Sequence, residues 1–408
     1  MEYVTRYLEQ RIRLLESHFK VVLVQGARQV GKSTMLSHMH PELRTIVFDP
    51  ILDRFGARSD PDLFLDSFPG PLILDEVQYA PELLSAIKRR VDQSPRFGQY
   101  LLTGSQNLGV LDRISETLAG RVAIVELEGF APGELRPRPH SWLEAWLNGE
   151  RRPPAWLQGH KSERNLVSTL WRGSLPGVQE MPDRLVPNFW SSYLQTYVER
   201  DVRSDAQPQS LEPFGRFVGV SAGLTAQEIN DSQLGREVGV APGTAQRWRG
   251  MLRRGFQWYE LPPCGFNAVK RVSGKRKGHM AEAALACHLQ RINSPEALAV
   301  SPLLGPIFES WVVGTVRKGS SLLAGQPGFS HWRSNGGAEV DLVLEWNGQW
   351  FPLEVKCKST LSGHDLKGIQ AFRATYPDRV SSVAVVVYAG ELVYQAAPDI
   401  WALPWHAL

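Results

Sequence analysis

The sequence predicts an α/β protein of about three domains. Its 408 residues exceed one domain of the usual size, about 100–200 residues. Over residues 1–135, apolar strand-like runs alternate with helix-like stretches, which is typical of a parallel sheet with crossover helices. The middle of the chain has mostly helical periodicity, and the last part is again mixed. We therefore expect a parallel-sheet domain at 1–150, a helical domain at 151–265 and a C-terminal α/β domain at 266–408.

The expected elements follow from apolar runs and from the turn residues between them. Residues 136–160 are rich in Pro, Arg, Trp and Gly and mark the first boundary. Residues 233–255 contain a short helix, a Gly-Val turn and a second helix opened by Pro242, which is helix-turn-helix spacing. A further helix is expected near 302–318. Strands are expected at 21–25, 44–49, 71–76, 99–104, 122–127, 338–346, 349–358 and 379–388.

Composition excludes several classes of protein. Hydrophobic residues make up 43% of the chain and charged residues 21%, so it is neither disordered nor fibrous. The net charge of only +3 does not by itself predict a polyanionic partner. Three scattered cysteines, Cys264, Cys287 and Cys357, are too few for a disulfide framework. The charged N-terminus lacks the apolar core of a signal peptide, so we expect a soluble, cytoplasmic protein without a membrane partner.

A phosphate-binding loop is predicted directly after the run at 21–25. The string GARQVGKS fits the pattern GxxxxGK[ST] and leads from a strand into a helix. Its glycines let backbone N–H groups surround a phosphate, its lysine contacts the β and γ phosphates, and its serine offers a hydroxyl to Mg²⁺. The expected ATP-binding residues are Gly26, Ala27, Arg28, Gln29, Val30, Gly31, Lys32, Ser33 and Thr34.

A second motif predicts ATP hydrolysis. The apolar run at 72–74 ends in Asp75, expected to hold Mg²⁺, and Glu76, expected to orient or deprotonate the attacking water. The string TGSQN follows the next strand, and Ser105 in it is positioned to sense the γ-phosphate. Arg113 and Arg121 are candidates to reach a neighbouring subunit's phosphate, although each is also explained as a solvated surface arginine.

These motifs resemble a known family. GARQVGKS, LILDEVQ, LLTGSQN and LAGR are similar to the ATPase domain of prokaryotic AAA-type ATPases that carry a C-terminal domain long catalogued as of unknown function. The strings GSLPG at 173–177 and YLQTYVERDV at 193–202 also resemble that family. The resemblance implies a P-loop ATPase, a winged-helix segment and a terminal domain of the PD-(D/E)xK nuclease fold. It also implies a homo-oligomer, with a hexameric ring as the first guess. The sequence departs from the family after Lys270, where VSGKRKGHMAEAALACHL replaces a basic strand and an Asp-Thr-Gly stretch.

A hairpin in the C-terminal domain predicts a second chemical site. Asn347-Gly348 is a strong signal for a two-residue turn, which sets Asp341 opposite Glu354 on one face of the hairpin. Two opposed carboxylates destabilise a hairpin unless a cation lies between them or one is protonated, and a hard ion such as Mg²⁺ or Mn²⁺ suits oxygen ligands.

This pair extends to a nuclease-like constellation. Asp341, Glu354 and Lys356 match the D…ExK core of metal-dependent nucleases, in which the lysine orients a water or stabilises developing charge. Glu309 resembles the acidic residue that many such folds add from their first helix, so Glu309, Asp341 and Glu354 are the expected metal ligands. The alternative is a set of solvated charges at the ends of strands.

Basic residues between 241 and 280 predict a nucleic-acid partner. This stretch contains nine Lys and Arg residues and a single acidic residue, Glu260. Trp248, Met251 and Leu252 have helical spacing and are expected in a core. The expected phosphate contacts are Arg247, Arg249, Arg253, Arg254, Lys275, Arg276 and Lys277.

Two functions fit these features. The first is an ATP-dependent DNA-processing protein that acts on duplex or branched DNA, with an added metal-dependent nuclease activity. The second is an ATP-controlled switch that binds DNA or protein and whose nuclease fold is inactive. ATP and Mg²⁺ are the expected cofactors in both, with Mn²⁺ as a further candidate at the C-terminal site.

Overall fold

The computed structural model describes residues 2–53, 55–104, 114, 116–135, 142–159, 162–196, 211–265 and 268–408. The chain divides into two compact units. The first comprises residues up to Phe130 with two short segments, Leu175–Gly177 and Arg254–Phe256; the second comprises Ala131–Ser174, Val178–Arg253 and Gln257–Leu408. The three-domain boundaries at 150 and 265 stay a prediction.

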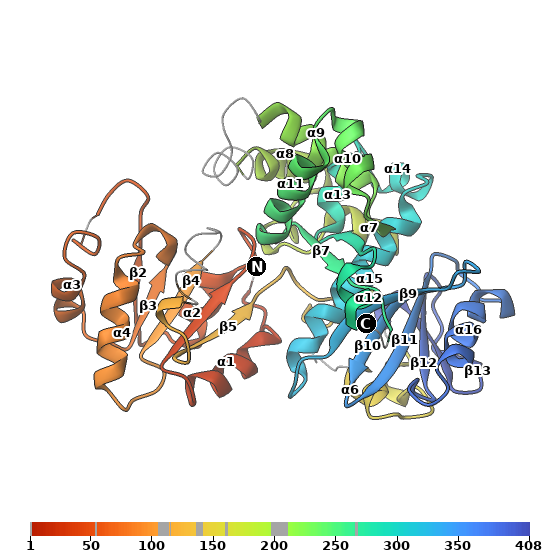
Figure 1. Cartoon of the computed structure of the whole chain (residues 1–408), viewed down its shortest axis with the longest axis horizontal. Coiled ribbons are helices and arrows are strands. Elements are labelled where there is room, and N and C mark those ends of the chain that lie inside the picture. The colour runs from red at the N-terminus through yellow and green to blue at the C-terminus, as the bar shows by residue number, and fades with distance from the viewer. Residues whose placement is uncertain are drawn as a thin grey trace. The chain divides into compact units, whose positions relative to one another are not determined.

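The first unit is built on a five-stranded parallel sheet with strand order β2-β3-β4-β1-β5 (Figure 1). The alternation of apolar runs and helices in the sequence predicted this sheet, and the prediction is confirmed. The elements are α1 (Leu8–Glu16), β1 (Val21–Gln25), α2 (Lys32–Met39), β2 (Arg44–Val47), α3 (Pro61–Ser67), β3 (Leu72–Asp75), η1 (Val77–Tyr79), α4 (Leu83–Gln93), β4 (Tyr100–Gly104) and β5 (Val122–Glu126).

Apolar side chains explain why this sheet forms. The central strands are buried on both faces, as expected for a parallel sheet covered by helices. Leu23 of β1 and Leu74 of β3 share one core with Phe64 of α3 and Ile87 of α4. Because all five strands are parallel, their carboxyl ends lie along one edge, and the loops that follow β1, β3 and β4 gather there.

The middle of the second unit combines helices with a small antiparallel sheet of order β6-β8-β7. Asn230 caps α10 by accepting hydrogen bonds from Ser232 and Gln233, and Gly239, with φ +80°, ends it. Pro242 then opens α11, so the predicted helix, turn and helix are present. The elements are α9 (Leu211–Gly223), β6 (Gln227–Glu228), α10 (Asp231–Val238), α11 (Pro242–Arg254), β7 (Trp258–Leu261), α12 (Ala268–Ser273), β8 (Lys277–Met280) and α13 (Ala283–Leu289).

The end of the second unit is a six-stranded mixed sheet of order β13-β14-β12-β11-β10-β9 (Figure 1). Asn347 and Gly348 both have positive φ and form the turn between β10 and β11. The pairing of Leu342 with Leu353 and of Trp346 with Gln349 confirms the predicted hairpin register. The elements are α15 (Leu304–Gly319), β9 (Gly328–Arg333), β10 (Glu339–Trp346), β11 (Gln349–Lys356), α16 (Lys367–Thr375), β12 (Ala384–Tyr388), β13 (Tyr394–Ala397) and β14 (Ile400–Pro404).

Shorter helices complete the second unit. Among the described helices, none combines the length and the apolar composition that crossing a bilayer requires. The remaining helices are α6 (Trp142–Leu147), α7 (Leu166–Arg172), α8 (Val186–Thr196), α14 (Pro295–Ala299) and the single turns η2 (Ala155–Leu157), η3 (Pro176–Val178), η4 (Asp183–Leu185), η7 (Ser320–Leu322), η8 (Gly363–Leu366) and η9 (Trp405–Ala407).

Candidate functional site

The loop between β1 and α2 has the backbone of a phosphate-binding loop. Gly26 has φ +151°, and a Cβ at this position would overlap the carbonyl oxygen of Leu127. Gly31 has φ +96° and caps α2, which begins at Lys32. At Gly26 only glycine allows both the positive φ and the close approach of the Leu127 carbonyl, so the local geometry requires the first glycine of the motif. The loop thus ends at the N-terminus of α2, where the positive end of the helix dipole favours binding of a phosphate.

The Lys32 side chain is held over this loop. Its ammonium donates to the carbonyl oxygens of Gly26 and Ala27, each at 2.9 Å. The residue is 6% exposed, so its charge acts in surroundings from which most water is excluded. Lys32 is therefore placed to contact a phosphate that the loop binds.

Arg6 supports the loop from the N-terminal segment. Its guanidinium donates to Val30 O at 2.9 Å and to Glu128 O at 2.8 Å, and it lies 4.6 Å from the ring centre of Phe130. Sequence reasoning missed Arg6 because no local signal connects it with a loop that begins 20 residues later.

Asp75 joins the two predicted ATPase motifs. Its Oδ1 atom accepts a hydrogen bond of 2.7 Å from the Ser33 hydroxyl, and it also accepts one from the Thr103 hydroxyl. Thr103 is completely buried at the end of β4. A hydroxyl and a carboxylate in contact beside a phosphate loop are the oxygen donors that Mg²⁺ prefers, so Ser33 and Asp75 fit this ion.

Glu76 follows Asp75 in a left-handed conformation, with φ +58° and ψ +46°. Its N–H donates to the Thr103 hydroxyl at 3.0 Å, and its carboxylate accepts a hydrogen bond from the Gln78 amide. A non-glycine residue in this region is strained and is often found at active sites. The two neighbouring carboxylates therefore have different partners: that of Asp75 contacts Ser33 and Thr103, and that of Glu76 contacts Gln78. Gln78 was missed because its role depends on the turn that brings it back to Glu76.

The C-terminal carboxylates form a second cluster, within the second unit. The Asp341 carboxylate accepts a hydrogen bond of 2.9 Å from Val355 N, next to Glu354 on the paired strand. The Lys356 ammonium lies 2.5 Å from Glu354 Oε1. Lys277 of β8 enters the same cluster, with its Nζ atom 2.6 Å from Glu309 Oε1 and 3.0 Å from Asp341 Oδ1. The structure thus brings together all four residues that the nuclease prediction named, and adds Lys277.

Burial determines the ionisation of this cluster. Burial raises the pKa of Glu354 well above its ordinary value, and the Asp341 charge acts in the same direction. Burial also raises the pKa of Glu309, to about 8. Burial opposes the charges on Asp341 and Lys277, but several partners together outweigh it. Lys277, Lys356 and the Val355 N–H lower the pKa of Asp341, and Asp341 and Glu309 raise that of Lys277. Lys277 and Asp341 are therefore the charged pair at the centre of the cluster.

A divalent metal does not fit this arrangement. The Lys277 ammonium lies against Glu309 and Asp341, two of the three expected ligands. Across the described part of the chain, no group of three or more His, Cys, Asp or Glu side chains is arranged to hold a metal ion. The residue types of a metal site are present, but a lysine takes the position of the cation.

The residues predicted to contact a nucleic acid differ in exposure and in how closely they pair with carboxylates. Arg249 pairs with both Asp231, at 2.8 Å, and Glu260, so its charge is engaged within the protein and a phosphate contact at Arg249 stays a prediction. The charge of the buried Lys277 is likewise engaged inside the protein, by Glu309 and Asp341, and a phosphate contact there also stays a prediction. Arg253 and Arg276 lie 3.6 Å and 3.9 Å from Glu260 Oε2, and Lys275 lies 3.9 Å from Glu228. Arg247, Arg253, Arg254 and Lys275 are exposed.

Comparison with known protein families agrees with the geometry at the N-terminal site. Residues 18–135 match the family model described as an AAA domain. This region is similar to AAA-type P-loop ATPase domains, and we call it the AAA domain below. Residues 163–296 match a Domain of unknown function (DUF8612), and residues 304–408 match a Domain of unknown function (DUF4143).

Individual proteins resemble the chain over much of its length. Two proteins called uncharacterized, one from Mycobacterium tuberculosis and one from Mycobacterium bovis, are each 27% identical over 395 residues, covering 97% of this chain and 82% of the relative. A Walker-type ATPase of Pyrococcus abyssi is 14% identical, with a TM-score of 0.40, covering 69% of this chain and 94% of its own. A RuvB variant of Thermotoga maritima is 15% identical, with a TM-score of 0.30, covering 64% and 90%. The two structural likenesses are too weak to show a shared fold.

Other residues predicted for the AAA domain have different positions. Arg28 donates to the Tyr79 hydroxyl at 3.4 Å, whereas Gln29 and Thr34 are exposed on the loop and on α2. Ser105 and Arg113 lie outside the described residues. Arg121 precedes β5 at the edge of the sheet opposite the phosphate loop, where it pairs with Asp92. It therefore does not reach the nucleotide of its own chain, and its role across a subunit boundary stays a prediction.

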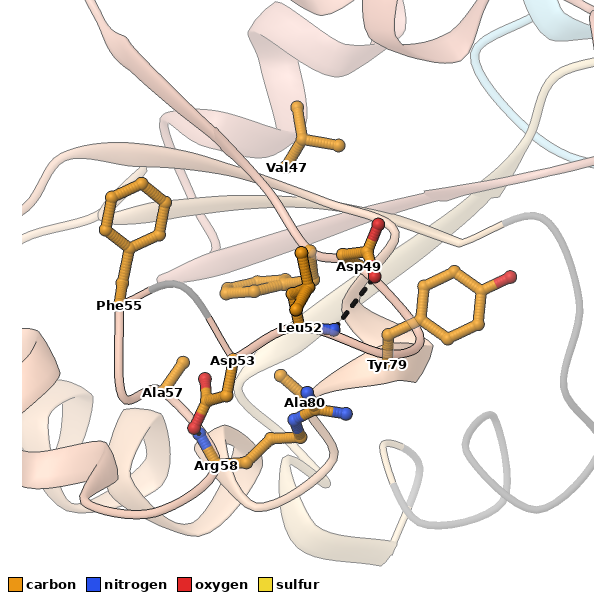
Figure 2. A pocket seen from close by; sticks show the side chains of 10 residues that line it. Val47, Asp49, Leu52, Asp53, Phe55, Ala57, Arg58, Tyr79 and Ala80 are labelled. Carbon is orange, nitrogen blue, oxygen red and sulfur yellow. Dashed lines mark hydrogen bonds between the residues drawn. The ribbon is translucent and has the colours of Figure 1, made fainter.

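A small hollow lies beside the end of β2 in the AAA domain. Figure 2 shows Asp49 accepting a hydrogen bond of 2.9 Å from Leu52 N, near Phe55 and Tyr79. The space for water inside it is about 10 Å³, which is about one molecule.

Proposed function

We propose that this protein hydrolyses ATP and uses the nucleotide to control binding to duplex or branched DNA. The observation that carries the first part is the bonded set of Ser33, Asp75, Thr103 and Glu76 beside the phosphate loop. It combines the two oxygen donors for Mg²⁺ with a separate carboxylate, as hydrolysis of a phosphoanhydride requires.

Each residue of this set has a role in the proposed reaction. Loop N–H groups and Lys32 bind the phosphates, and Ser33 and Asp75 hold Mg²⁺, which when bound neutralises charge on the phosphate oxygens. Glu76 orients the attacking water or accepts its proton. Thr103 fixes Asp75 and the Glu76 backbone relative to each other.

The second part of the proposal rests on the segment from α9 to β8. Its order of elements, α9, β6, α10, α11, β7, α12 and β8, supports the winged helix that we propose for this segment, with α11 as the second helix of its helix-turn-helix. Arg247, Arg253 and Arg254 are exposed on α11, and Lys275 is exposed just before β8. Such a cluster of cations supports contact with phosphates of a duplex.

The proposal takes the form of a switch in which the C-terminal domain does not cut DNA. Lys277 inside the carboxylate cluster favours this form over a metal-dependent nuclease. Assembly into a homo-oligomer, for which a hexameric ring is the first guess, belongs to the proposal because AAA sites commonly use an arginine from a neighbour.

The central experiment measures ATP turnover and nucleotide affinity in three variants. Lys32→Ala is expected to abolish binding of a fluorescent ATP analogue. Glu76→Gln is expected to bind the analogue with unchanged affinity and to lose turnover. Glu82→Gln, at the exposed residue immediately before α4, is the control and is expected to behave as wild type. Normal turnover by Glu76→Gln would refute the assignment of Glu76.

DNA distinguishes the switch from a motor. A switch predicts that the dissociation constant for duplex or junction DNA changes between ADP and a non-hydrolysable ATP analogue, while turnover changes little on adding DNA. Turnover that rises several-fold with DNA would favour the motor. Failure to bind any oligonucleotide at low ionic strength would refute the second part of the proposal.

A further inference from the structure

The Lys277 side chain occupies the centre of the C-terminal carboxylate cluster. It comes from β8, 64 residues before Asp341, so its position there depends on the tertiary fold. Its ammonium contacts Glu309 of α15 at 2.6 Å and Asp341 of β10 at 3.0 Å, and the residue is 7% exposed. Three secondary-structure elements therefore meet at one buried charge.

The strand that carries Lys277 is held firmly in place. A Cβ at the next residue, Gly278, would overlap the ring of Trp258, so β8 lies directly against this side chain. One residue further, the fully buried His279 contacts the Ser310 hydroxyl at 3.0 Å through Nδ1, and Ser310 follows Glu309 on α15. These contacts fix β8 relative to α15, and with it the origin of the Lys277 side chain.

The cluster already contains two cationic groups of the protein. Glu309, Asp341 and Glu354 are accompanied by the ammonium groups of Lys277 and Lys356. Buried charges are stable when paired, and adding a divalent cation next to an ammonium would bring like charges together where little water screens them. A metal would have to displace Lys277 from both of its partners.

We propose that the Lys277 ammonium is the resident cation of this cluster, replacing the divalent metal that an opposed Asp and Glu with a neighbouring lysine would otherwise bind. The cluster then joins β8, α15 and β10 into one rigid body. The nuclease residue types are then present without a metal site. This inference is independent of ATP hydrolysis and of DNA binding.

The first test compares Mn²⁺ binding by the full-length wild type and Asp341→Asn, without nucleotide. Electron paramagnetic resonance counts bound Mn²⁺, and any binding at the AAA domain is common to both proteins. Equal stoichiometry is the expected result. One Mn²⁺ more per chain in the wild type than in Asp341→Asn would overturn the inference, because it would place a metal on Asp341.

The second test removes the ammonium while keeping a side chain of similar length. Lys277→Met is expected to bind one more Mn²⁺ per chain than the wild type, and Mn²⁺ is expected to raise its thermal midpoint. The double variant Lys277→Met, Asp341→Asn should lose the gained ion. A folded Lys277→Met protein that binds no additional Mn²⁺ would contradict the inference. If the variant does not fold, the comparison of wild type with Asp341→Asn still decides.

Lys358→Met is the matched control. Lys358 also pairs with a carboxylate, Asp365 at 2.7 Å, but its side chain is 58% exposed and lies outside the cluster. This variant is expected to bind as much Mn²⁺ as the wild type. A gain of Mn²⁺ in Lys358→Met equal to that in Lys277→Met would show that loss of any lysine has this effect, and would overturn the inference.

Discussion

At the scale of single residues, the Thr103 hydroxyl links two neighbouring residues of the proposed nucleotide site, Asp75 and Glu76. One hydroxyl contacts the Asp75 carboxylate and the Glu76 N–H, so it connects the residue proposed to bind Mg²⁺ with the residue proposed to act on water. Thr103 donates no group of its own to the phosphates in the proposed reaction. Its effect on turnover should therefore arise through the positions of Asp75 and Glu76.

We predict that Thr103→Val lowers the turnover number by roughly 10-fold, equal to about 1.4 kcal/mol in the activation barrier, with nucleotide affinity nearly unchanged. Valine has a similar shape but cannot form either hydrogen bond. Steady-state ATPase assays and titration with a fluorescent analogue measure the two quantities. Thr45→Val, on β2, is the control. Equal turnover in both variants would contradict the role of Thr103.

The partners of Lys277 could not be predicted from the local sequence. It follows Lys275 and Arg276 in the sequence, so local charge predicted a phosphate contact. Its partners Glu309 and Asp341 lie 32 and 64 residues later, and β8 is buried along its whole length, so no alternation revealed which side chain turns inward. The carboxylate pair itself was predictable, because the Asn-Gly turn sets the register of its own hairpin.

At the scale of elements, α11 carries arginines with opposite roles. Trp248, Met251 and Leu252 are buried as the helical spacing predicted. Arg249 on the same helix is tied to Asp231 and Glu260, whereas Arg247 is exposed. Net charge along the sequence could not separate the two, because it does not show where acidic partners from α10 and β7 lie.

We predict that Arg249→Ala lowers the free energy of unfolding by roughly 2–4 kcal/mol, since it leaves Glu260 and Asp231 without their closest cation. Urea denaturation followed by circular dichroism measures this change. Arg247→Ala serves as the comparison and should change stability by less than about 0.5 kcal/mol. Similar losses in both variants would show that α11 does not divide its arginines in this way.

For Arg247→Ala we predict weaker DNA binding with normal stability. Loss of one phosphate contact should reduce the slope of log affinity against log salt by about one unit. Fluorescence anisotropy of a labelled duplex at several salt concentrations measures this slope. Lys367→Ala, at an exposed lysine on α16, is the control and should keep the wild-type slope. An unchanged slope in Arg247→Ala would remove α11 from the proposed DNA surface.

At the scale of the whole molecule, the sequence predicted the α/β class and the parallel sheet of the ATPase well. Periodicity and the phosphate-loop motif are local, so each appears directly in the chain. The buried polar contacts of the second unit were not predictable, because they join segments distant in sequence. His279 is an example: it stacks on Tyr259 with ring centres 5.1 Å apart and contacts Ser310 of α15.

His279 also predicts how stability depends on pH. Burial lowers the pKa of His279 well below its ordinary value, and the charges of Lys277, His331 and Arg317 act in the same direction. The folded protein therefore keeps this ring neutral, while the unfolded chain takes up a proton as the pH falls below about 6.5. Acid thus favours unfolding at this site, and the effect is absent above that pH.

We expect His279→Gln to reduce the loss of stability below pH 6.5 by up to roughly 1.4 kcal/mol per pH unit relative to wild type. Urea denaturation at pH 7.5, 6.5 and about 5.5 gives the profiles, with His18→Gln, at an exposed residue of the first unit, as the control. Parallel profiles for wild type and His279→Gln would exclude this histidine as a source of acid sensitivity.

Arg6 connects two parts of the first unit that lie far apart in the sequence. One guanidinium bonds both to Val30 in the phosphate loop and to Glu128, and it stacks on Phe130, just where the chain leaves the first unit. Displacing either backbone carbonyl strains the other, because a rigid planar group spans them. Arg6 therefore couples the position of the phosphate loop to that of the segment that ends the first unit.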